Sequence, residues 1–295
     1  MRNIIFDTDI GIDCDDAVAL TMLLELQRRK ECCLKAITVS SVRVGATATI
    51  KAILNHFGID TIPIGVRVGE PLCCDYTNTY ANSAKEKYGT KDCFCDAVKT
   101  LRRVLSKATT KTTIIAVGPL SNIAALLEST ADEYSLLDGV SLVNEKVDEF
   151  FIMGGNFVEN QTDALGEFNI RQDIASARKV FDLCPRDILL VPFECGARVY
   201  THIPKKESPL RFSMACHASY FGQSPDDFKR PSWDPVTCLC AFGDFTEFYY
   251  FSDKIRVEVD DVGRTFPVSS PNGNVRYLMP FAGYEKIGDI INRLI

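Results

Sequence analysis

Short apolar runs alternate with segments of helical periodicity along most of the chain. The run Asn3–Phe6 has the length and composition of a buried strand. In the segment from Asp15 to about Arg29, apolar residues such as Leu20 and Leu24 recur at the spacing of one helix face. A strand followed by an amphipathic helix is therefore expected at the start of the chain.

The same alternation continues as far as residue 191. Further strands are expected at 34–39, 61–66, 113–117, 150–153 and 188–191, and further helices at 47–57, 97–107, 120–128 and 174–181. Strands that alternate with helices are typical of parallel sheets joined by crossover helices. The pattern predicts an α/β fold with an open, mostly parallel Rossmann-like sheet and helices on both faces.

No internal repeat, low-complexity tract or long linker interrupts the sequence, so residues 1–295 are expected to form a single domain. The stretch 204–230 is less regular, and we interpret it as a lid or rim over the site. In open α/β sheets, ligands bind beyond the carboxyl ends of the strands. Functional residues are therefore expected in the loops that follow the strands.

Composition and charge exclude several classes of function. The net charge of -6 provides no basic field for a phosphate backbone, so nucleic acid is not expected as a partner. No apolar run approaches the roughly 20 residues of a membrane helix, and the amino terminus lacks a signal-peptide pattern, so a cytoplasmic protein without a membrane partner is expected. The twelve cysteines lack the spacing of a structural zinc site and are interpreted as reduced thiols.

The loop after the first expected strand is strongly acidic. Five of the ten residues from Asp7 to Asp16 are aspartates. Like charges this close raise one another's pKa unless they are solvated apart or neutralised by a cation. A donor set made only of oxygens suits Ca²⁺ or Mg²⁺, and a flexible shell of several carboxylates favours Ca²⁺. The loop is therefore a candidate metal site, although Asp15 or Asp16 would also serve as an ordinary helix cap.

Two other functions are compatible with the acidic loop on its own. A hydrophobic strand followed by Asp-x-Asp also opens phosphatases of the haloacid dehalogenase type, in which Asp7 would be the nucleophile. The spacing of Asp9, Asp13 and Asp15 is similar to that of a calcium-binding hand, but the flanking strand and the missing glutamate at the twelfth position argue against it. Residues elsewhere in the chain decide between these interpretations.

Three later segments, together with the acidic loop, resemble the motifs of one protein family. They are Ala116–Asn122 (AVGPLSN), Met153–Asn156 (MGGN) leading to Glu167–Ile170 (EFNI), and Trp233–Pro235 (WDP). With these four motifs in the same order, the chain resembles the inosine-uridine-preferring nucleoside hydrolase family along its whole length. The resemblance implies an enzyme that hydrolyses the N-glycosidic bond of a ribonucleoside with a calcium-activated water.

The resemblance also implies roles for individual residues. Asp9 would be the catalytic base, and the ligands of Ca²⁺ would be Asp9, Asp16, Asp234 and the carbonyl oxygen of Val117. A simpler structural role is compatible with two of these motifs. Asp234 and the Gly118-Pro119 pair both look like the starts of helices.

A second group of residues is implied to bind the nucleoside. Asp15 would contact the 2′-hydroxyl, Glu167 the 5′-hydroxyl and Asn169 the 3′-hydroxyl, with Asn156 or Asn160 assisting. Glu167 and Asn169 are two residues apart, so in an extended segment both would point to the same side and hold adjacent hydroxyls of one sugar. Two polar side chains in a loop are also commonly just solvated.

The chain departs from the family pattern in its first two loops. The family's usual loop has fewer residues between its second aspartate and the Asp-Asp pair, whereas here an insertion brings Asp13 and Cys14. Asp13 could therefore replace Asp15 in some role. The usual Gly-Asn after the second strand is absent. A contact to ribose or metal is then lost or rebuilt by Ser40, Ser41 or Arg43.

The third departure is Trp233, which stands where many relatives carry a histidine that protonates the leaving base. Tryptophan is a poor proton donor, but it stacks on a purine ring. This is similar to the purine-preferring branch, with Tyr76, Tyr80 or Tyr220 as candidates for a second aromatic wall. The simpler alternative for Trp233 is a core or rim aromatic, and His217, in the expected lid, is a candidate acid.

The sequence therefore predicts a nucleoside hydrolase with a purine-leaning or broad range, with Ca²⁺ as cofactor and a small-molecule nucleoside as substrate. The alternative is a ribose- or nucleoside-binding protein that keeps the metal pocket without turnover. The resemblance implies a homodimer or homotetramer and a role in purine salvage.

Overall fold

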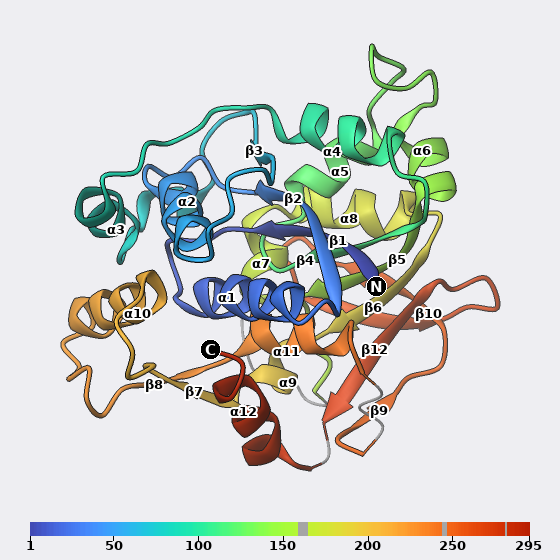
Figure 1. Cartoon of the computed structure of the whole chain (residues 1–295). Coiled ribbons are helices and arrows are strands. Elements are labelled where there is room, and N and C mark those ends of the chain that lie inside the picture. Colours follow the sequence, from blue (N-terminus) through green and yellow to red (C-terminus); the bar gives the residue numbers. More distant parts are fainter. Residues whose placement is uncertain (159–164, 244–246, 281) are drawn as a thin grey trace.

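The structure, a computed structural model, describes residues 1–158, 165–243, 247–280 and 282–295. Figure 1 shows a sheet crossing the molecule with helices on both sides. The strands are β1 (Arg2–Thr8), β2 (Cys32–Val39), β3 (Ile64–Val66), β4 (Thr112–Ala116), β5 (Val147–Met153), β6 (Asp187–Val191), β7 (Tyr200–His202), β8 (Lys229–Pro231), β9 (Tyr249–Phe251), β10 (Ile255–Val259), β11 (Thr265–Ser269) and β12 (Val275–Pro280).

The helices confirm every helix expected before residue 191, with ends shifted by a few residues. They are α1 (Asp15–Arg28), α2 (Ala46–His56), α3 (Ala81–Tyr88), α4 (Ala97–Ser106), α5 (Ser121–Leu127), α6 (Gly139–Lys146), α7 (Phe168–Gln172), α8 (Ile174–Leu183), α9 (Phe193–Gly196), α10 (Pro209–Tyr220), α11 (Trp233–Cys240) and α12 (Tyr284–Asn292), with a short 3₁₀ helix, η1, at Cys73–Tyr76.

Ten of the described strands form one sheet with the order β11-β10-β12-β6-β5-β4-β1-β2-β3, in which β9 pairs with β12 beside this path. The pairs from β12 through β6, β5, β4, β1 and β2 to β3 are all parallel. The predicted α/β fold with an open, mostly parallel sheet is thus confirmed. Because parallel strands end at the same edge, the loops after β1, β4 and β5 lie close together.

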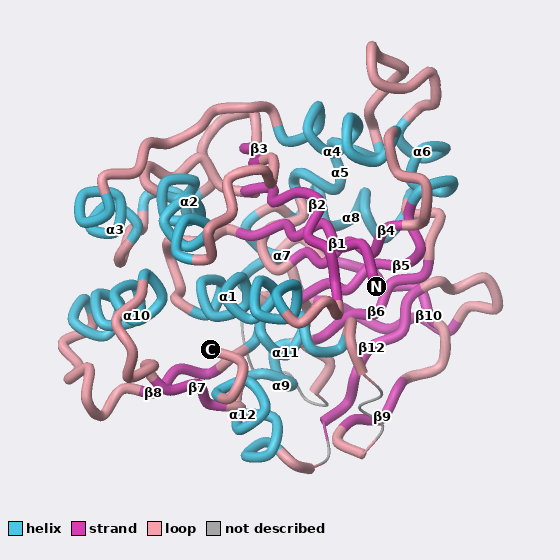
Figure 2. Tube along the Cα trace, viewed as in Figure 1, coloured by secondary structure: helices cyan, strands magenta, loops and turns pink. Residues whose placement is uncertain are grey.

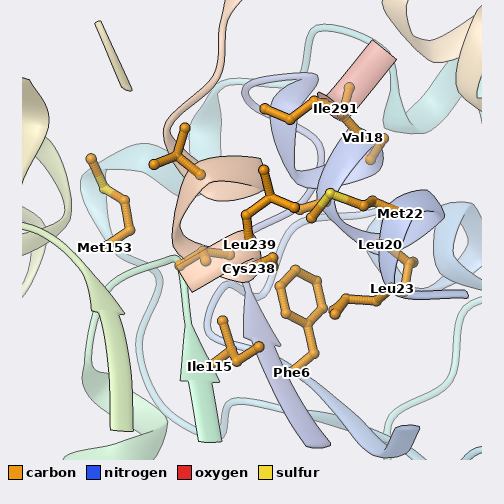
Figure 3. Packing of buried hydrophobic residues seen from close by; sticks show 14 of the residues in the cluster. Phe6, Val18, Leu20, Met22, Leu23, Ile115, Met153, Cys238, Leu239 and Ile291 are labelled. Carbon is orange, nitrogen blue, oxygen red and sulfur yellow. The ribbon is translucent and has the colours of Figure 1, made fainter. Parts of the chain in front are cut away.

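The two faces of the sheet carry separate hydrophobic clusters. Residues alternate between them along β1, so that Phe6 packs with α1, α2 and α11 while Ile5 packs with α4, α5 and α8. Figure 3 shows Phe6 of β1 packed near Leu23 of α1 and near Cys238 and Leu239 of α11. This packing fixes the starts of α1 and α11, where the acidic residues lie.

Several elements of the fold were not expected from the sequence pattern, and the strands β10 and β11 and the helix α10 show why. The antiparallel strands β10 and β11 are half exposed and were not expected. A regular helix, α10, lies within 204–230, where the pattern predicts little regular structure. Its buried positions include the polar residues Ser213 and His217, so the apolar residues of this segment do not repeat at the spacing of a helix face. Ser208 is the N-cap of α10 and accepts a hydrogen bond from the N–H of Arg211.

The structure also describes the state of the cysteines and the length of the helices. All twelve cysteines are free thiols, as predicted. Within the described part of the chain, no helix has the length and apolar character needed to cross a membrane.

Candidate functional site

A cavity of about 300 Å³ opens beyond the carboxyl ends of β1, β4 and β5. Ligand sites of open α/β sheets lie at this edge. The loop after β1 and the start of α1 supply some of its lining, and the starts of α7, α9 and α11 supply most of the rest. The lining residues are Asp9, Ile12, Asp13, Asp15, Asp16, Val117, Met153, Glu167, Phe168, Asn169, Phe193, Arg230, Trp233 and Asp234.

Three carboxylates converge in this cavity. Oxygens of Asp15, Asp16 and Asp234 lie within 4.8 Å of one another, and all three side chains are buried. Asp15 and Asp16 begin α1, and Asp234 lies in the first turn of α11. The helix dipole favours negative charge at these positions, so two helix starts help to hold the cluster.

Hydrogen bonds tie the two helix starts together. Asp15 Oδ2 accepts hydrogen bonds from the backbone N–H of Trp233 at 3.0 Å and of Asp234 at 3.2 Å. The hydroxyl of Thr8 at the end of β1 donates to Asp16. As Figure 2 shows, α1 and α11 lie side by side, and they are also in contact. Residues that are far apart in the sequence therefore form one rigid acidic cluster.

Asp9 reaches the same cavity from the loop after β1. Gly118, just beyond β4, makes room for this loop, because a Cβ atom there would lie 2.9 Å from the Asp9 nitrogen and 2.5 Å from Ser40 Oγ. Arg43 Nη1 donates a 2.7 Å hydrogen bond to the Asp9 carbonyl, and Nε donates a 2.6 Å bond to the Thr77 carbonyl. Arg43 thus ties the acidic loop to its neighbour through backbone groups.

Burial dominates the electrostatics of the cluster. It raises the pKa of Asp9 to about 6, although the positive charge of Arg43 lowers it. Burial also raises the pKa values of Asp15, Asp16 and Asp234 well above their usual range, and neighbouring carboxylates raise them further. The carboxyls therefore favour their protonated forms unless a cation takes the place of the protons. A buried set of several carboxylate oxygens fits a hard divalent cation such as Ca²⁺.

The Val117 carbonyl and Asn169 meet at the end of β4. Asn169 Nδ2 donates a 2.9 Å hydrogen bond to the Val117 carbonyl and is 3.3 Å from the Met153 carbonyl. A carbonyl oxygen has two lone pairs, so this bond leaves one for a cation. Among the described residues, none donates a hydrogen bond to the amide oxygen of Asn169, so this oxygen can accept one from a ligand.

Glu167 and Asn169 both line the cavity, but not in the extended segment that the sequence analysis assumes. Glu167 is the N-cap of α7, and Asn169 is in the first turn of this helix. The Glu167 carboxylate accepts hydrogen bonds from the N–H groups of Asn169 at 2.9 Å, Gly155 at 3.1 Å and Ile170 at 3.2 Å. Burial raises the pKa of Glu167 to about 7, although these hydrogen bonds lower it. A capping glutamate is compatible with a helix, so spacing alone gave the wrong local conformation.

The additional residue Asp13 pairs with Arg230 rather than with the carboxylate cluster. A second set of donors, Asp13, Cys14 and His217, also lies within 4.8 Å. The guanidinium of Arg230 already neutralises Asp13, so this second set is less suited to a cation. His217 is 2% exposed and does not line the cavity.

Trp233 lines the cavity beside another aromatic ring. Its ring stacks with that of Phe193 at a centroid distance of 5.3 Å and an interplanar angle of 28°, and its Nε1 donates a 2.8 Å hydrogen bond to the Phe193 carbonyl. Gly196 permits this packing, because a Cβ atom there would lie 2.5 Å from the Trp233 Cα atom. Phe193 thus takes the place expected for a second aromatic residue.

The tyrosines proposed for that wall do not line the cavity. Tyr80 is buried, and its hydroxyl accepts a 3.0 Å hydrogen bond from the N–H of Gly11, while Tyr76 and Tyr220 are exposed. Phe193 lies two residues after the end of β6, so the rule about the carboxyl ends of strands could have identified it. Phe168, Ile12, Met153 and Arg230 also line the cavity without having been predicted.

The remaining polar candidates have different locations. Asn156 is not among the lining residues, and its backbone N–H donates to Thr265 Oγ1 at 3.1 Å. Asn160 lies outside the described residues. Asp7 is fully buried, accepts hydrogen bonds from Thr38 and from Asn122 at 2.7 Å, and does not line the cavity. A phosphatase nucleophile needs access to its substrate, so this position disfavours the role for Asp7.

Curated relatives share part of the sequence. The pyrimidine-specific ribonucleoside hydrolase RihA of Enterobacter sp. (strain 638) is 29% identical over 189 residues, which cover 60% of this chain and 56% of that protein. The non-specific ribonucleoside hydrolase RihC of Klebsiella pneumoniae (strain 342) is 30% identical over 189 residues, which cover 60% of this chain and 57% of that protein. The chain therefore spans little more than half the length of these relatives.

A similar solved structure and a family profile each match nearly the whole chain. The crystal structure of an inosine-uridine preferring nucleoside hydrolase from Bacillus anthracis superposes with a TM-score of 0.72 at 20% identity, over 100% of this chain and 99% of that chain. At this identity the superposition shows a shared fold. The profile described as inosine-uridine preferring nucleoside hydrolase matches residues 4–278. The chain therefore belongs to the inosine-uridine preferring nucleoside hydrolase family.

Proposed function

We propose that the chain hydrolyses ribonucleosides to free base and ribose, with Ca²⁺ held by Asp9, Asp16, Asp234 and the Val117 carbonyl. One observation carries the proposal. Buried carboxylates from two distant segments share a cavity with Glu167 and Asn169, two polar groups suited to a pentose. Family membership and this chemistry point in the same direction.

The residues divide the reaction between them. Hydrolysis of a ribosyl bond passes through a state with positive charge on the sugar, which nearby carboxylates stabilise. Bound Ca²⁺ would lower the pKa of a water that it coordinates. Asp9 accepts the proton of the attacking water, and Asp15 accepts a hydrogen bond from the 2′-hydroxyl. Glu167 and Asn169 hold the 5′- and 3′-hydroxyls, with Asn156 or Asn160 assisting.

The base specificity is proposed to be purine-leaning or broad. Trp233 and Phe193 line the cavity, and a base gains about 1–3 kcal/mol by stacking on an aromatic ring. The relatives RihA and RihC are pyrimidine-specific and non-specific, respectively. A broad range is compatible with both observations, because stacking tolerates any base. A homodimer or homotetramer, with a role in purine salvage, also stays a prediction.

A panel of purine and pyrimidine ribosides tests this function. Chromatography measures the free base released by calcium-loaded protein and by protein treated with a chelator. We expect base and ribose in equal amounts, loss of release with chelator, and recovery when Ca²⁺ is restored. Asp234→Asn is expected to remove activity, whereas Asp138→Asn, at the exposed cap of α6, provides a control with the same change of charge. No release from any riboside would refute the proposal.

Binding without turnover is the second candidate. The observation that favours it is the position of the three histidines, since none lines the cavity and none can protonate a leaving base there. A thermal-shift experiment separates the two functions. An intact nucleoside that stabilises the protein for hours, with no base released, supports binding, whereas an enzyme converts it and leaves only the shift caused by ribose.

A further inference from the structure

Arg230 is the only cationic side chain among the described residues that line the cavity. It lies on β8, close to the start of α11, and reaches the loop after β1. Arg230 Nε donates hydrogen bonds of 2.8 and 3.0 Å to the two carboxylate oxygens of Asp13, and Nη2 donates to Oδ2 as well. The two residues form a forked ion pair between segments 217 residues apart.

Asp13 is fixed from several sides. Its Oδ1 atom accepts a 2.7 Å hydrogen bond from the N–H of Cys14, and its carbonyl accepts a 2.8 Å bond from the hydroxyl of Tyr80. The ring of His217 lies behind it, with Nε2 3.8 Å from Oδ1 and Nδ1 3.0 Å from Thr79 Oγ1. Because these contacts fix the Asp13 carboxylate, they also limit the orientations of the Arg230 guanidinium that is hydrogen-bonded to it.

The Arg230 guanidinium has N–H groups that are not engaged by Asp13 and can donate hydrogen bonds to a ligand. Arg230 Nη1 has no acceptor among the residues that the structure describes, and the side chain is 29% exposed. The guanidinium carbon lies 5.3 Å from the centroid of the Trp233 ring, whose other neighbour is Phe193. A cation is therefore held against an aromatic wall with part of its hydrogen-bonding capacity unused.

The lining of the cavity combines two kinds of chemistry. The carboxylate cluster with Glu167 and Asn169 suits the hydroxyls of a pentose and the cation beside it. The other lining residues include Ile12, Phe168, Phe193 and Trp233, which offer apolar contact and stacking. They also include Arg230, whose guanidinium is paired with Asp13 and supplies the cationic group. These properties match a flat heterocycle that carries acceptors and becomes negative as it leaves.

We propose that Arg230 contacts the leaving base and stabilises the negative charge that develops on it, in place of a general acid. Asp13 is the residue that positions Arg230. The inference rests on the proposed hydrolase function. In the step, the bond between C1′ and the base nitrogen breaks, and its electron pair stays on the base. The oxygen of water bonds to C1′, and the proton of that water passes to Asp9. The base departs as an anion beside the guanidinium and takes a proton from solvent.

The same geometry favours one class of base. Two N–H donors of a guanidinium match two acceptors on one edge, such as the O6 carbonyl oxygen and the N7 atom of a 6-oxopurine. A 6-aminopurine presents a donor in place of that carbonyl. Inosine is therefore expected to be hydrolysed with a higher kcat/KM than adenosine, and Arg230 determines the difference.

Two ribosides with different leaving groups separate this role from damage to the rest of the site. Inosine needs stabilisation of its leaving base, whereas p-nitrophenyl β-D-ribofuranoside releases an anion that is stable without help. For Arg230→Gln we expect kcat/KM for inosine to fall about 100-fold, as on loss of a donor to a developing anion, with little change for the p-nitrophenyl riboside. Asp13→Asn is expected to shift the ratio of the two substrates in the same direction, by less.

Two further variants serve as controls. Lys229→Gln removes a positive charge from the neighbouring exposed position of β8, which does not line the cavity, and should leave the substrate ratio unchanged. Arg230→Lys keeps the charge without the fork, so it should retain activity on inosine but lose the preference over adenosine. This variant also covers the case in which Arg230→Gln does not fold.

The outcomes are distinct. An equal loss on both ribosides in Arg230→Gln, or an unchanged ratio of inosine to adenosine in Arg230→Lys, would overturn the inference and leave the hydrolase function intact. If the unaltered protein releases neither base nor p-nitrophenolate, the proposed function fails and this inference fails with it.

Discussion

The carboxylate of Asp15 at the start of α1 accepts a 3.0 Å hydrogen bond from the backbone N–H of Trp233 at the start of α11. The two residues are 218 positions apart in the sequence. Because Asp234 follows Trp233, this contact places the last carboxylate of the cluster beside the first two. A single side chain thus links the candidate metal ligands to the candidate base-binding residue.

Removal of this link is expected to weaken the cation as well as the substrate. In Asp15→Ala the N–H groups of Trp233 and Asp234 lose their acceptor, and residues that orient metal ligands contribute about 10–100-fold to metal affinity. Calorimetric titration of chelator-treated protein with Ca²⁺ measures the effect. Asp138→Ala, which removes a carboxylate at the exposed cap of α6, should bind Ca²⁺ as the parent does. Equal affinity in the parent and in Asp15→Ala would contradict the expected role of the link.

Stability of the cation-free protein should depend on pH in a specific way. Burial raises the pKa of Asp9 to about 6 and the pKa values of Asp7 and Glu167 to about 7. A carboxyl with a raised folded pKa binds more protons in the folded than in the unfolded state, so its contribution is full below about pH 4 and is lost as pH rises through the folded pKa. The Tm of chelator-treated protein should therefore fall between about pH 5 and pH 7.

Calcium should reduce this fall in Tm, because the cation stabilises the ionised carboxylates and displaces their protons. Thermal unfolding at a series of pH values, with chelator and with saturating Ca²⁺, makes the comparison. Two profiles that run parallel across the whole range would show that the cation does not bind to these carboxyls.

Trp233 should affect the base and not the sugar. Loss of stacking costs about 1–3 kcal/mol per base, so Trp233→Leu is expected to raise KM for purine ribosides by about 5- to 150-fold. Ribose as a competitive inhibitor reports on the pentose end, and its inhibition constant should stay as in the parent. A matched loss of ribose affinity would place the effect in the link to Asp15 and not in the base contact.

Arg43 should determine the stability of the acidic loop. It is 5% exposed and donates hydrogen bonds to the carbonyls of Asp9, Thr77 and Cys74 at 2.6 to 2.7 Å. Arg43→Met leaves these acceptors buried without donors, so the free energy of unfolding should fall by about 3 kcal/mol. Arg28→Met removes a largely exposed arginine and should leave the free energy of unfolding nearly unchanged. Denaturant titration measures both, and similar values for the two variants would contradict the expectation.

The sequence predicts the parallel sheet well because long apolar runs and amphipathic helices carry strong periodic signals. It does not predict α10, whose buried face includes Ser213 and His217, nor β10 and β11, whose strands are half exposed. Tertiary packing stabilises these elements, and a local pattern contains little of that information.

The residues of the candidate site also differ in whether the sequence could identify them. The crowded carboxylates in the loop after β1 indicate a cation site that includes Asp9 and Asp16, whereas the role of Asp234 follows only from the resemblance to the family. Arg230 could not be identified, since its role depends on a pairing with Asp13 across 217 residues. The helical conformation of Asn169 was also missed, because two-residue spacing is informative only in an extended segment.

The central claim is that separate segments of the chain surround one cation beside a pentose. A crystal structure of the protein with Ca²⁺ and ribose tests it most directly, with anomalous scattering to identify the ion. We expect one Ca²⁺ bound by carboxylate oxygens of Asp9, Asp16 and Asp234 and by the Val117 carbonyl, with ribose hydroxyls near Glu167. Absence of an ion among these residues at saturating Ca²⁺, or ribose bound elsewhere, would contradict the account.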